Sequence, residues 1–306
     1  MKILVIGTGS IGQRHASNLA GLGATVETVS MREDGLAGAI RRIEAGADGV
    51  VIATETQIRL PLIEAAAAKD IPLFIEKPLA ADPDTVSAIY AAARPILKRS
   101  MVGYMMRYHP GFRHLAQHDF SDAYRYFFEI GHDVTQWRAN WRFADSYAAR
   151  PEGGGVLLDL CHELDMAHCL FPGALGGVES LGHRNYPGVD MATMIAREGP
   201  VQGTVAMDYL APKLIRRAEI AGTRSRRVMD FAANRFVEDG NVTEFTFERN
   251  DMFLSIMRDF LALAAGKAPS DVEFLPRMDL ARASCEEVAA ARAARQFTGH
   301  MDGGKP

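Results

Sequence analysis

The fold is decided by the first fifteen residues, which are Met1-Lys2-Ile3-Leu4-Val5-Ile6-Gly7-Thr8-Gly9-Ser10-Ile11-Gly12-Gln13-Arg14-His15. The run from Lys2 to Ile6 is short, apolar and rich in β-branched residues, which is typical of a buried strand. Three glycines follow in the order G-x-G-x-x-G, and residues 13–22 after them have a helical pattern. The stretch therefore predicts a strand, a tight turn and a helix in succession.

Each glycine of this turn has a physical task. Gly7 permits the sharp turn out of the strand, Gly9 lets a pyrophosphate approach the backbone, and Gly12 allows the helix to pack closely on the strand. The free N–H groups at the helix start, around Ser10 and Ile11, favour a bound phosphate, helped by the positive end of the helix dipole. These five residues are therefore predicted to bind a dinucleotide; the alternative is a glycine-rich turn without a ligand.

The end of the second predicted strand, 24–30, bears on the choice between NAD and NADP. An acidic residue there binds the ribose 2′-hydroxyl of NAD, whereas a basic residue accommodates the 2′-phosphate of NADP. The strand runs into Ser30 and Arg32, which suit a phosphate, but Glu33 and Asp34 follow at once and suit a ribose. Both cofactors remain open, and Ser30 with Arg32 favours NADP.

Strands and helices alternate through the first part of the chain. Buried strands are expected at 24–30, 49–53, 71–75 and 101–104, and helices at 13–22, 35–46, 61–69 and 84–93. This alternation is typical of a parallel sheet with helices on both faces. We predict an α/β fold whose N-terminal domain, residues 1–120, is a doubly wound Rossmann sheet that binds the dinucleotide.

The pattern changes near residue 120, where strands begin to follow one another without helices between them. Strands are expected at 123–131, 178–181, 192–197, 203–209, 217–222, 226–231 and 242–247, and helices at 157–170, 252–265 and 278–296. Consecutive strands separated by turn residues indicate an antiparallel sheet. We predict an α+β domain over residues 121–306 with a large, mainly antiparallel sheet for substrate binding and oligomerisation, and a frayed tail at 298–306.

Composition excludes several classes of protein. With 306 residues, 48% hydrophobic residues and a net charge of −4, the chain is an ordinary globular protein without the basic balance of a nucleic-acid binder. Three cysteines without a C-x-x-C motif argue against a disulfide framework or a metal site and fit the reducing cytoplasm. No apolar run approaches the ~20 residues that cross a bilayer, and no signal peptide is expected.

Three further motifs accompany the glycine turn. Glu76-Lys77-Pro78 ends a predicted strand, Gly103-Tyr104-Met105-Met106-Arg107-Tyr108-His109-Pro110 follows the next one, and Gly153-Gly154-Gly155-Val156-Leu157-Leu158-Asp159 leads to His162 and Asp165. Together with Gly7 to His15, this set resembles the G-x-G-x-x-G-x-x-H, E-K-P, G-Y-x-x-R-x-x-P and G-G-G-x-x-x-D-x-x-x-H-x-x-D motifs of the glucose–fructose oxidoreductase, inositol dehydrogenase and rhizopine catabolism (Gfo/Idh/MocA) oxidoreductases. The resemblance covers nearly the whole chain, including the order of the domains.

The resemblance implies an NAD(P)-dependent dehydrogenase or reductase that acts on CH–OH groups of a sugar, polyol or (nucleotide-)sugar derivative. It implies that Glu76 and Lys77 lie at the cofactor, where the Lys77 ammonium can hydrogen-bond the oxygen whose charge changes during hydride transfer. The alternative for Lys77 is a surface lysine that forms an ion pair with Glu76. Pro78 fixes the backbone and thereby the direction of the lysine.

His162 is the preferred acid/base, because a neutral imidazole can accept the hydroxyl proton as hydride leaves the same carbon. Asp165 lies three residues later on the same predicted helix face and can orient the ring. The chain departs from the family pattern in having three rather than four residues from Asp159 to His162. This departure leaves the catalytic role of Asp159 open and makes Glu163 a competing acid/base.

A second departure follows the third predicted strand. Residues 54–59, Thr54-Glu55-Thr56-Gln57-Ile58-Arg59, stand where the family commonly has T-P-x-x-x-H. Thr54 and Glu55 are expected beside the cofactor. Arg59, in the histidine position, has two interpretations: it binds a substrate anion, or it is an exposed arginine on a helix surface.

Substrate contacts are expected from two regions. Arg107, with Tyr108 beside it, is suited to bind a carboxylate or phosphate of the substrate. The alternative for Arg107 is a purely structural contact that joins the domains. Trp137 and Tyr147 precede the predicted site helix in a segment that mixes aromatic and basic residues, and His162 completes the substrate-binding set. Aromatic faces stack on sugar rings or bases, whereas core or interface packing is the alternative.

A second function class is a dinucleotide-binding regulator of the same fold that catalyses no reaction. The presence of both Lys77 and His162 argues against it, since a sensor needs neither. The expected partners are a sugar-like small molecule and further copies of the chain, as a homodimer or homotetramer formed through the C-terminal sheet; neither nucleic acid nor a membrane is expected.

Overall fold

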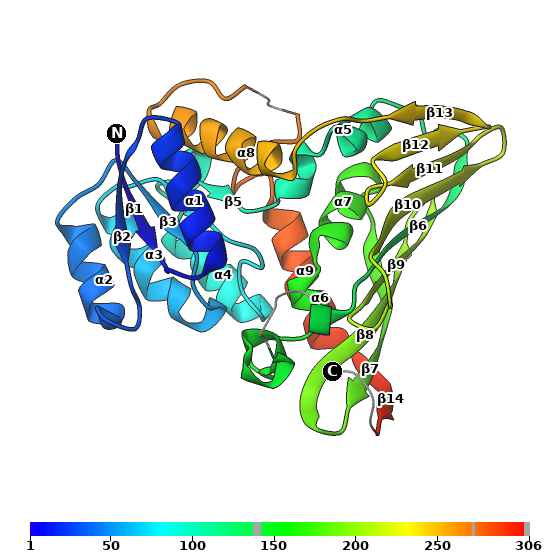
Figure 1. The fold of residues 1–306 in the computed structure, drawn as a ribbon, viewed down its shortest axis with the longest axis horizontal. Coiled ribbons are helices and arrows are strands. Elements are labelled where there is room, and N and C mark those ends of the chain that lie inside the picture. Colours follow the sequence, from blue (N-terminus) through cyan, green and yellow to red (C-terminus); the bar gives the residue numbers. More distant parts are fainter. Residues whose placement is uncertain (137–141, 271–272, 303–306) are drawn as a thin grey trace. The chain divides into compact units, whose positions relative to one another are not determined.

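The computed structural model describes residues 1–136, 142–270 and 273–302. These residues form two compact units, shown in Figure 1. The first unit combines Met1–Tyr108 with Glu248–Glu286, and the second combines His109–Phe247 with Glu287–Pro306. Each unit is therefore built from two separate segments of the chain.

The first unit contains the predicted alternation of strands and helices. Its strands are β1 (Lys2–Ile6), β2 (Thr25–Val29), β3 (Gly49–Ile52), β4 (Leu73–Ile75) and β5 (Met101–Val102). Its α-helices are α1 (Ser10–Gly21), α2 (Gly35–Glu44), α3 (Arg59–Ala68), α4 (Pro83–Ala92) and α8 (Arg249–Ala264), with 3₁₀ turns η1 (Thr56–Ile58), η2 (Leu97–Arg99) and η3 (Met105–Tyr108).

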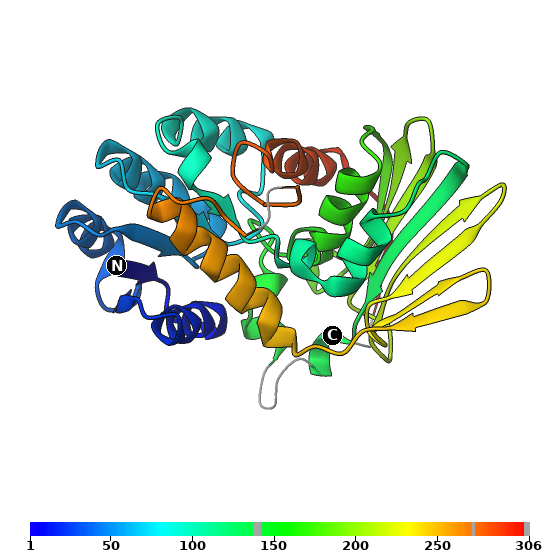
Figure 2. The same cartoon turned by 90° about the horizontal axis from the view of Figure 1, so that it is seen from above.

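The five strands form one parallel sheet in the order β2-β1-β3-β4-β5. Helices α1 and α8 cover one face, and α2, α3 and α4 cover the other (Figure 2). Because the strand order reverses between β1 and β3, the carboxyl ends of these two strands lie side by side at a topological switch point, where doubly wound sheets bind ligands. The predicted doubly wound parallel sheet is confirmed.

Helix α8 joins this unit although it directly follows strand β13 of the second unit in sequence. Its start carries a capping box in which Glu248 N donates to Asp251 Oδ2 at 3.0 Å. Phe260 of α8 packs edge-on against Phe74 of β4, with ring centroids 5.9 Å apart. The predicted domain 121–306 includes residues 248–286, whereas the structure packs them in the first unit.

The second unit is built around a nine-stranded sheet of the described residues. Its strands are β6 (Ala123–Gly131), β7 (Ala174–His183), β8 (Tyr186–Glu198), β9 (Gln202–Asp208), β10 (Ile215–Gly222), β11 (Arg226–Asp230), β12 (Arg235–Glu238), β13 (Asn241–Glu244) and β14 (Gln296–Met301). Its α-helices are α5 (Pro110–Ala116), α6 (Val156–Asp159) and α7 (His162–Leu170), with 3₁₀ turns η4 (Val134–Gln136), η5 (Phe143–Asp145) and η6 (Tyr147–Ala149); α9 (Arg282–Ala294) crosses the boundary between the units.

The large sheet has the order β13-β12-β11-β10-β6-β9-β8-β7-β14 and is antiparallel except for the pairs β6–β9 and β7–β14. Helices α5, α6 and α7 pack on one face of this sheet, and the other face carries no helix of the described part of the unit (Figure 1). Strand β9 shows the expected alternation, since Gly203, Val205 and Met207 are buried while the residues between them are partly exposed. The predicted mainly antiparallel sheet is confirmed.

Several details differ from the prediction. The helix expected at 157–170 is broken, because Leu160 leaves the helical region with φ −105° and ψ 27° between α6 and α7. Strand β12 was not predicted. Residues 298–301 of the tail expected to fray instead belong to β14, which pairs with β7 and thereby satisfies backbone groups of this segment, whereas residues 303–306 lie outside the described residues.

No helix among the described residues combines the length and the apolar character needed to cross a membrane.

Candidate active site

The glycine turn between β1 and α1 has the geometry that its sequence predicts. Gly7 adopts a φ of +110°, which an L side chain rarely reaches, and its N–H donates to Val29 O at 3.0 Å. A Cβ added to Gly12 would lie 1.9 Å from Gly7 O, so only glycine permits this approach of α1 to the turn. Beside Gly9, the helix N-cap, an added Cβ would meet no heavy atom within 4 Å. The protein thus leaves open space over Gly9, next to the N-terminus of α1.

The first turn of α1, where Ser10 and Ile11 lie, contains no acidic residue. The neighbouring strand β3 is joined to this region because Ala53 N donates to Ile6 O at 2.8 Å. Thr54 and Glu55 follow directly, with Thr54 half-buried and Glu55 exposed. The predicted cofactor residues after β1 and β3 therefore lie at neighbouring strand ends, with no carboxylate in the helix turn to repel a phosphate.

At the end of β2, the acidic residue is engaged in a local contact. Ser30 N donates to Asp34 Oδ2 at 3.1 Å, and Asp34 is the N-cap residue of α2. Arg32 is exposed. One oxygen of the Asp34 carboxylate therefore satisfies a main-chain donor, while the guanidinium of Arg32 faces solvent.

The Glu76-Lys77-Pro78 turn follows β4 and is organised by Glu76. His15 Nε2 lies 2.6 Å from Glu76 Oε1, and Lys77 N donates to Glu76 Oε2 at 3.1 Å. Burial by itself raises the pKa of the Glu76 carboxyl, but the hydrogen bond from His15 and nearby positive charges outweigh it, so the pKa lies below its usual value. The Lys77–Pro78 peptide bond is cis, and the Lys77 side chain is only partly buried.

The glycine that opens the next motif accommodates this carboxylate. A Cβ added to Gly103 would lie 3.0 Å from the Glu76 carboxyl group. Glu76, predicted as a cofactor residue, is thus buried between α1 and the segment after β5. These contacts fix the backbone from which Lys77 projects, and the cofactor role of Glu76 stays a prediction.

Arg107 and Tyr108, predicted to bind substrate, are both buried in the first unit. The guanidinium of Arg107 lies over the Tyr104 ring, 5.5 Å from its centroid, and donates to Ser284 Oγ at 3.2 Å. The Tyr108 hydroxyl donates to Asp259 Oδ2 at 2.8 Å. These contacts give both side chains a structural role within the unit; their substrate role stays a prediction.

In the second unit, Asp159 ends α6 and accepts hydrogen bonds from two phenols. Tyr147 donates to Oδ1, and Tyr209 donates to Oδ2 at 3.1 Å. Burial first, and then the charge of Asp159, holds the pKa of Tyr209 well above its usual value, so this phenol stays protonated and donates. Tyr147 differs, because 46% of it is exposed. Asp159 thereby holds an accessible phenol in a fixed position.

The two competing acid/base candidates, His162 and Glu163, have different environments. Glu163 is fully buried and forms a bidentate pair with Arg216, whose Nε and Nη2 donate to its two oxygens at 2.6 and 3.2 Å. His162 begins α7 and is 6% exposed, and Asp165 is fully buried one turn later. A carboxylate held by a bidentate guanidinium is a weak base, since its charged form is already stabilised.

Arg216 also affects His109, the N-cap residue of α5. Burial, and then the positive charge of Arg216, lowers the pKa of His109 to about 4. Its Nδ1 accepts a hydrogen bond from Gly111 N at 3.0 Å, so the ring is neutral in the folded state.

This depressed pKa predicts a loss of stability in acid. Unfolding lets His109 bind a proton below its unfolded pKa of ~6.5, so the stabilisation weakens as the pH falls from ~6.5 towards 4. Between pH 7 and pH 5 we expect about 2 kcal/mol of lost unfolding free energy from this residue. Urea unfolding of the wild type and of His109→Asn, which keeps a capping acceptor but does not titrate, measures the difference. An equal acid loss in both proteins contradicts it; His300→Asn, an exposed histidine, serves as the control.

Several functional neighbours were not predicted from the sequence. Tyr209 lies 50 residues from Asp159, and Arg216 lies 53 residues from Glu163. Asp190 of β8 accepts a hydrogen bond from Leu157 N at 2.8 Å and so holds the start of α6. These are contacts between distant elements, for which the local pattern carries no signal. Trp137, predicted to bind substrate, lies outside the described residues.

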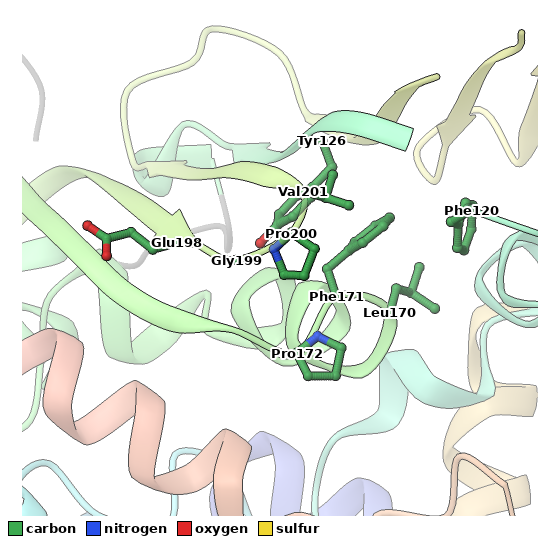
Figure 3. A pocket seen from close by; sticks show the side chains of 9 residues that line it. All are labelled: Phe120, Tyr126, Leu170, Phe171, Pro172, Glu198, Gly199, Pro200 and Val201. Atoms are coloured by element: carbon green, nitrogen blue, oxygen red, sulfur yellow. The ribbon is translucent and has the colours of Figure 1, made fainter. Parts of the chain in front are cut away.

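A shallow pocket of about 240 Å³ lies elsewhere in the second unit (Figure 3). It is lined by residues of β6 and the segment before it, of the end of α7 and the segment after it, and of the β8–β9 turn: Phe120, Tyr126, Leu170, Phe171, Pro172, Glu198, Gly199, Pro200 and Val201. None of them is a predicted site residue. Across the described parts of the chain, no group of three or more His, Cys, Asp or Glu side chains is arranged to hold a metal ion.

Comparison with known proteins adds an independent assignment of the fold. No family model matches the chain. Inositol 2-dehydrogenase of Rhizobium meliloti (strain 1021) is 33% identical over 122 residues, an alignment that spans 35% of this chain and only 37% of that protein.

Two solved structures match over nearly the whole length. UDP-N-acetylglucosamine 3-dehydrogenase GnnA from Acidithiobacillus ferrooxidans has a TM-score of 0.74 at 19% identity, covering 96% of this chain and 95% of its own. The scyllo-inositol dehydrogenase from Lactobacillus casei, with bound cofactor NAD(H) and scyllo-inositol, has a TM-score of 0.73 at 18% identity, covering 97% and 96%. The chain has the fold of the Gfo/Idh/MocA oxidoreductases and is related in sequence to inositol 2-dehydrogenase, which confirms the resemblance predicted from its four motifs.

Proposed function

We propose that the protein is an NAD(P)-dependent oxidoreductase that transfers a hydride between nicotinamide and a CH–OH carbon of a sugar, polyol or (nucleotide-)sugar derivative. The observation that carries this proposal is the turn at the sheet's switch point, where Gly12 approaches Gly7 and the space over Gly9 is open. The dinucleotide is assigned to the domain 1–120 and the substrate to the domain 121–306.

The residues of the first unit fit a nicotinamide dinucleotide. The open backbone at Gly9 and the N-terminus of α1 would hold the pyrophosphate. Ser30 and Arg32 would hold a 2′-phosphate, and the engagement of Asp34 with Ser30 N favours NADP over NAD at this position. Hydride exchange is the chemistry that this cofactor supplies when bound.

The chain supplies the proton chemistry and the oxygen contact. In this proposal the ammonium of Lys77 hydrogen-bonds the substrate oxygen, and the imidazole of His162 accepts its proton during oxidation or returns it during reduction. The pairing of Glu163 with Arg216 supports His162 over Glu163 as the acid/base. Asp165, buried one turn later on α7, is assigned to orientation of the ring.

Asp159 is assigned a positioning role. Because its two oxygens accept hydrogen bonds from Tyr147 and Tyr209, it fixes the exposed Tyr147 phenol as a substrate contact. An amphipathic phenol suits a sugar, since the ring packs on C–H faces while the hydroxyl hydrogen-bonds. The named relatives act on inositols or a UDP-linked amino sugar, which supports this substrate class.

The experiment is a titration of the purified protein with NADH and NADPH by fluorescence, followed by absorbance at 340 nm across a panel of inositols, sugars and nucleotide sugars. Cofactor-dependent turnover with at least one compound is expected, with tighter binding of NADPH. Tight cofactor binding without absorbance change across the panel supports the alternative, a dinucleotide-binding regulator. Absence of binding to both dinucleotides overturns the proposal.

We assign the open face of the nine-stranded sheet to pairing with a second copy of the chain, as a homodimer or a homotetramer in the cytoplasm. On this face Ala192, Met194 and Ala196 of β8 lie beside Ala206 of β9, with the polar Glu179 of β7 in register with Met194. Met194 is 55% exposed there. Exposed apolar patches on a sheet mark interaction surfaces.

A new charge on this face should prevent the pairing. Met194→Arg would place one cation from each copy in the proposed interface, and desolvation of two such charges costs several kcal/mol. We expect the wild type to sediment as a dimer or tetramer and the variant as a monomer. Arg94→Glu, an exposed position in the first unit, is the control; a variant that keeps the wild-type assembly contradicts the assignment.

A further inference from the structure

Arg59 is a buried arginine at the start of α3, only 3% exposed. The interpretation of Arg59 as an exposed helix arginine is therefore wrong. Its guanidinium points back to the carboxyl edge of the parallel sheet, where it meets main-chain carbonyl groups rather than solvent.

One side of the guanidinium contacts the segment after β3. Nε and Nη2 of Arg59 donate to Thr54 O at 3.1 and 2.6 Å. The other side contacts the segment after β4, because Nη1 donates to the carbonyl oxygens of Glu76 and Pro78 and, at 3.5 Å, to Leu79 O. A single rigid fork thus joins the ends of two adjacent parallel strands.

The second set of carbonyl groups brackets Lys77. Glu76 O belongs to the peptide bond that precedes Lys77, and Pro78 O lies one residue beyond it. The Glu76 side chain is fixed independently, by His15 at 2.6 Å and by Lys77 N at 3.1 Å. The backbone of Lys77 is therefore held on both sides by one guanidinium and one carboxylate.

We propose that Arg59 is a positioning residue that directs the Lys77 amine. Only arginine carries donors in a planar fork that can bond carbonyl groups of two segments at once; lysine offers one ammonium centre and glutamine a single amide. The catalytic meaning of this direction rests on the function proposed above. The positioning itself is a property of the first unit alone and can be measured without substrate.

The test observes the Lys77 amine directly. Lysines are reductively methylated with ¹³C, and the Lys77 dimethylamine resonance is assigned by its loss in Lys77→Arg. Arg59→Gln is expected to shift or split this resonance. The matched control is Arg99→Gln, which also removes an arginine that donates to a main-chain carbonyl in the same unit, that of Asp70, and is expected to leave the resonance in place.

Kinetics supply the second readout. A displacement of about 1 Å in a reacting group lowers rates ~10²-fold. We therefore expect Arg59→Gln to lower kcat by ~10², while its dinucleotide dissociation constant stays within ~3-fold of the wild-type value. Arg59→Lys should recover part of the lost kcat. In the Lys77→Met background, Arg59→Gln should lower kcat little further.

An unmoved Lys77 resonance in folded Arg59→Gln overturns the positioning role, whatever the activity. If Arg59→Gln does not fold, the Lys77 resonance is measured in Arg59→Lys instead. An unmoved Lys77 resonance in that variant likewise overturns the positioning role. If the wild-type protein shows no turnover, but the Lys77 resonance shifts in the Arg59→Gln variant, the proposed function is overturned and the positioning role remains supported.

Discussion

Gly12→Ala is expected to abolish dinucleotide binding and to lower the unfolding free energy by about 3 kcal/mol. The added Cβ would lie 1.9 Å from Gly7 O and 2.9 Å from its carbonyl carbon. Both atoms are backbone, so no side-chain rotation relieves the contact, and α1 must move away from the turn. Chemical denaturation and NADPH fluorescence titration measure the two effects, with at least ~100-fold weaker binding expected.

Two glycines on the same stretch make matched controls. Gly21, in the last turn of α1, has no heavy atom within 4 Å of an added Cβ, so Gly21→Ala should keep binding and gain up to ~1 kcal/mol of helix stability. Gly9 is equally open in the protein, so Gly9→Ala should keep the fold while the methyl group blocks the pyrophosphate. Wild-type affinity in both Gly9→Ala and Gly12→Ala would place the dinucleotide elsewhere.

The first unit was largely predictable because its signals are local. β1, the glycine turn and α1 are adjacent in sequence. The inner strand Gly49–Ile52 is a buried apolar run, which burial on both faces of the sheet requires. The parallel order follows from the alternation with helices. What could not be predicted is the return of α8 to this unit, since its apolar face could pack on either sheet.

The site details depend on contacts between distant residues. A helix was expected through 157–170, but Asp159 is held by Tyr209 from the end of β9 and the chain leaves the helical region at Leu160. Neither interpretation of Arg59, as a substrate-anion ligand or as a surface arginine, includes its contacts with carbonyl groups, because Glu76 O belongs to another strand end. The argument for His162 over Glu163 as the acid/base depends on Arg216, which pairs with the glutamate from 53 residues away.

Loss of either proposed catalytic side chain is expected to lower kcat ~10³-fold. Lys77→Met removes the donor to the substrate oxygen, and loss of one such donor costs 10²–10³ in rate. His162→Asn keeps size and polarity but cannot exchange the proton, which costs ~10²–10⁴. Both variants leave the sequence of the glycine turn unchanged, so the dissociation constant for NADPH should stay within ~3-fold. Single-turnover absorbance at 340 nm separates these losses from product release.

The double variant tests whether the two groups, which belong to different units, serve one step. Groups that act together in a single transition state are strongly non-additive, so Lys77→Met with His162→Asn should be little slower than the slower single variant. Multiplied losses, near 10⁶, would mean that lysine and histidine act in separate steps. Lys69→Met and His300→Asn, exposed residues outside the proposed site, control for the loss of a charge and of a ring. Unchanged kcat in either catalytic variant, with the fold intact, removes that residue from the mechanism.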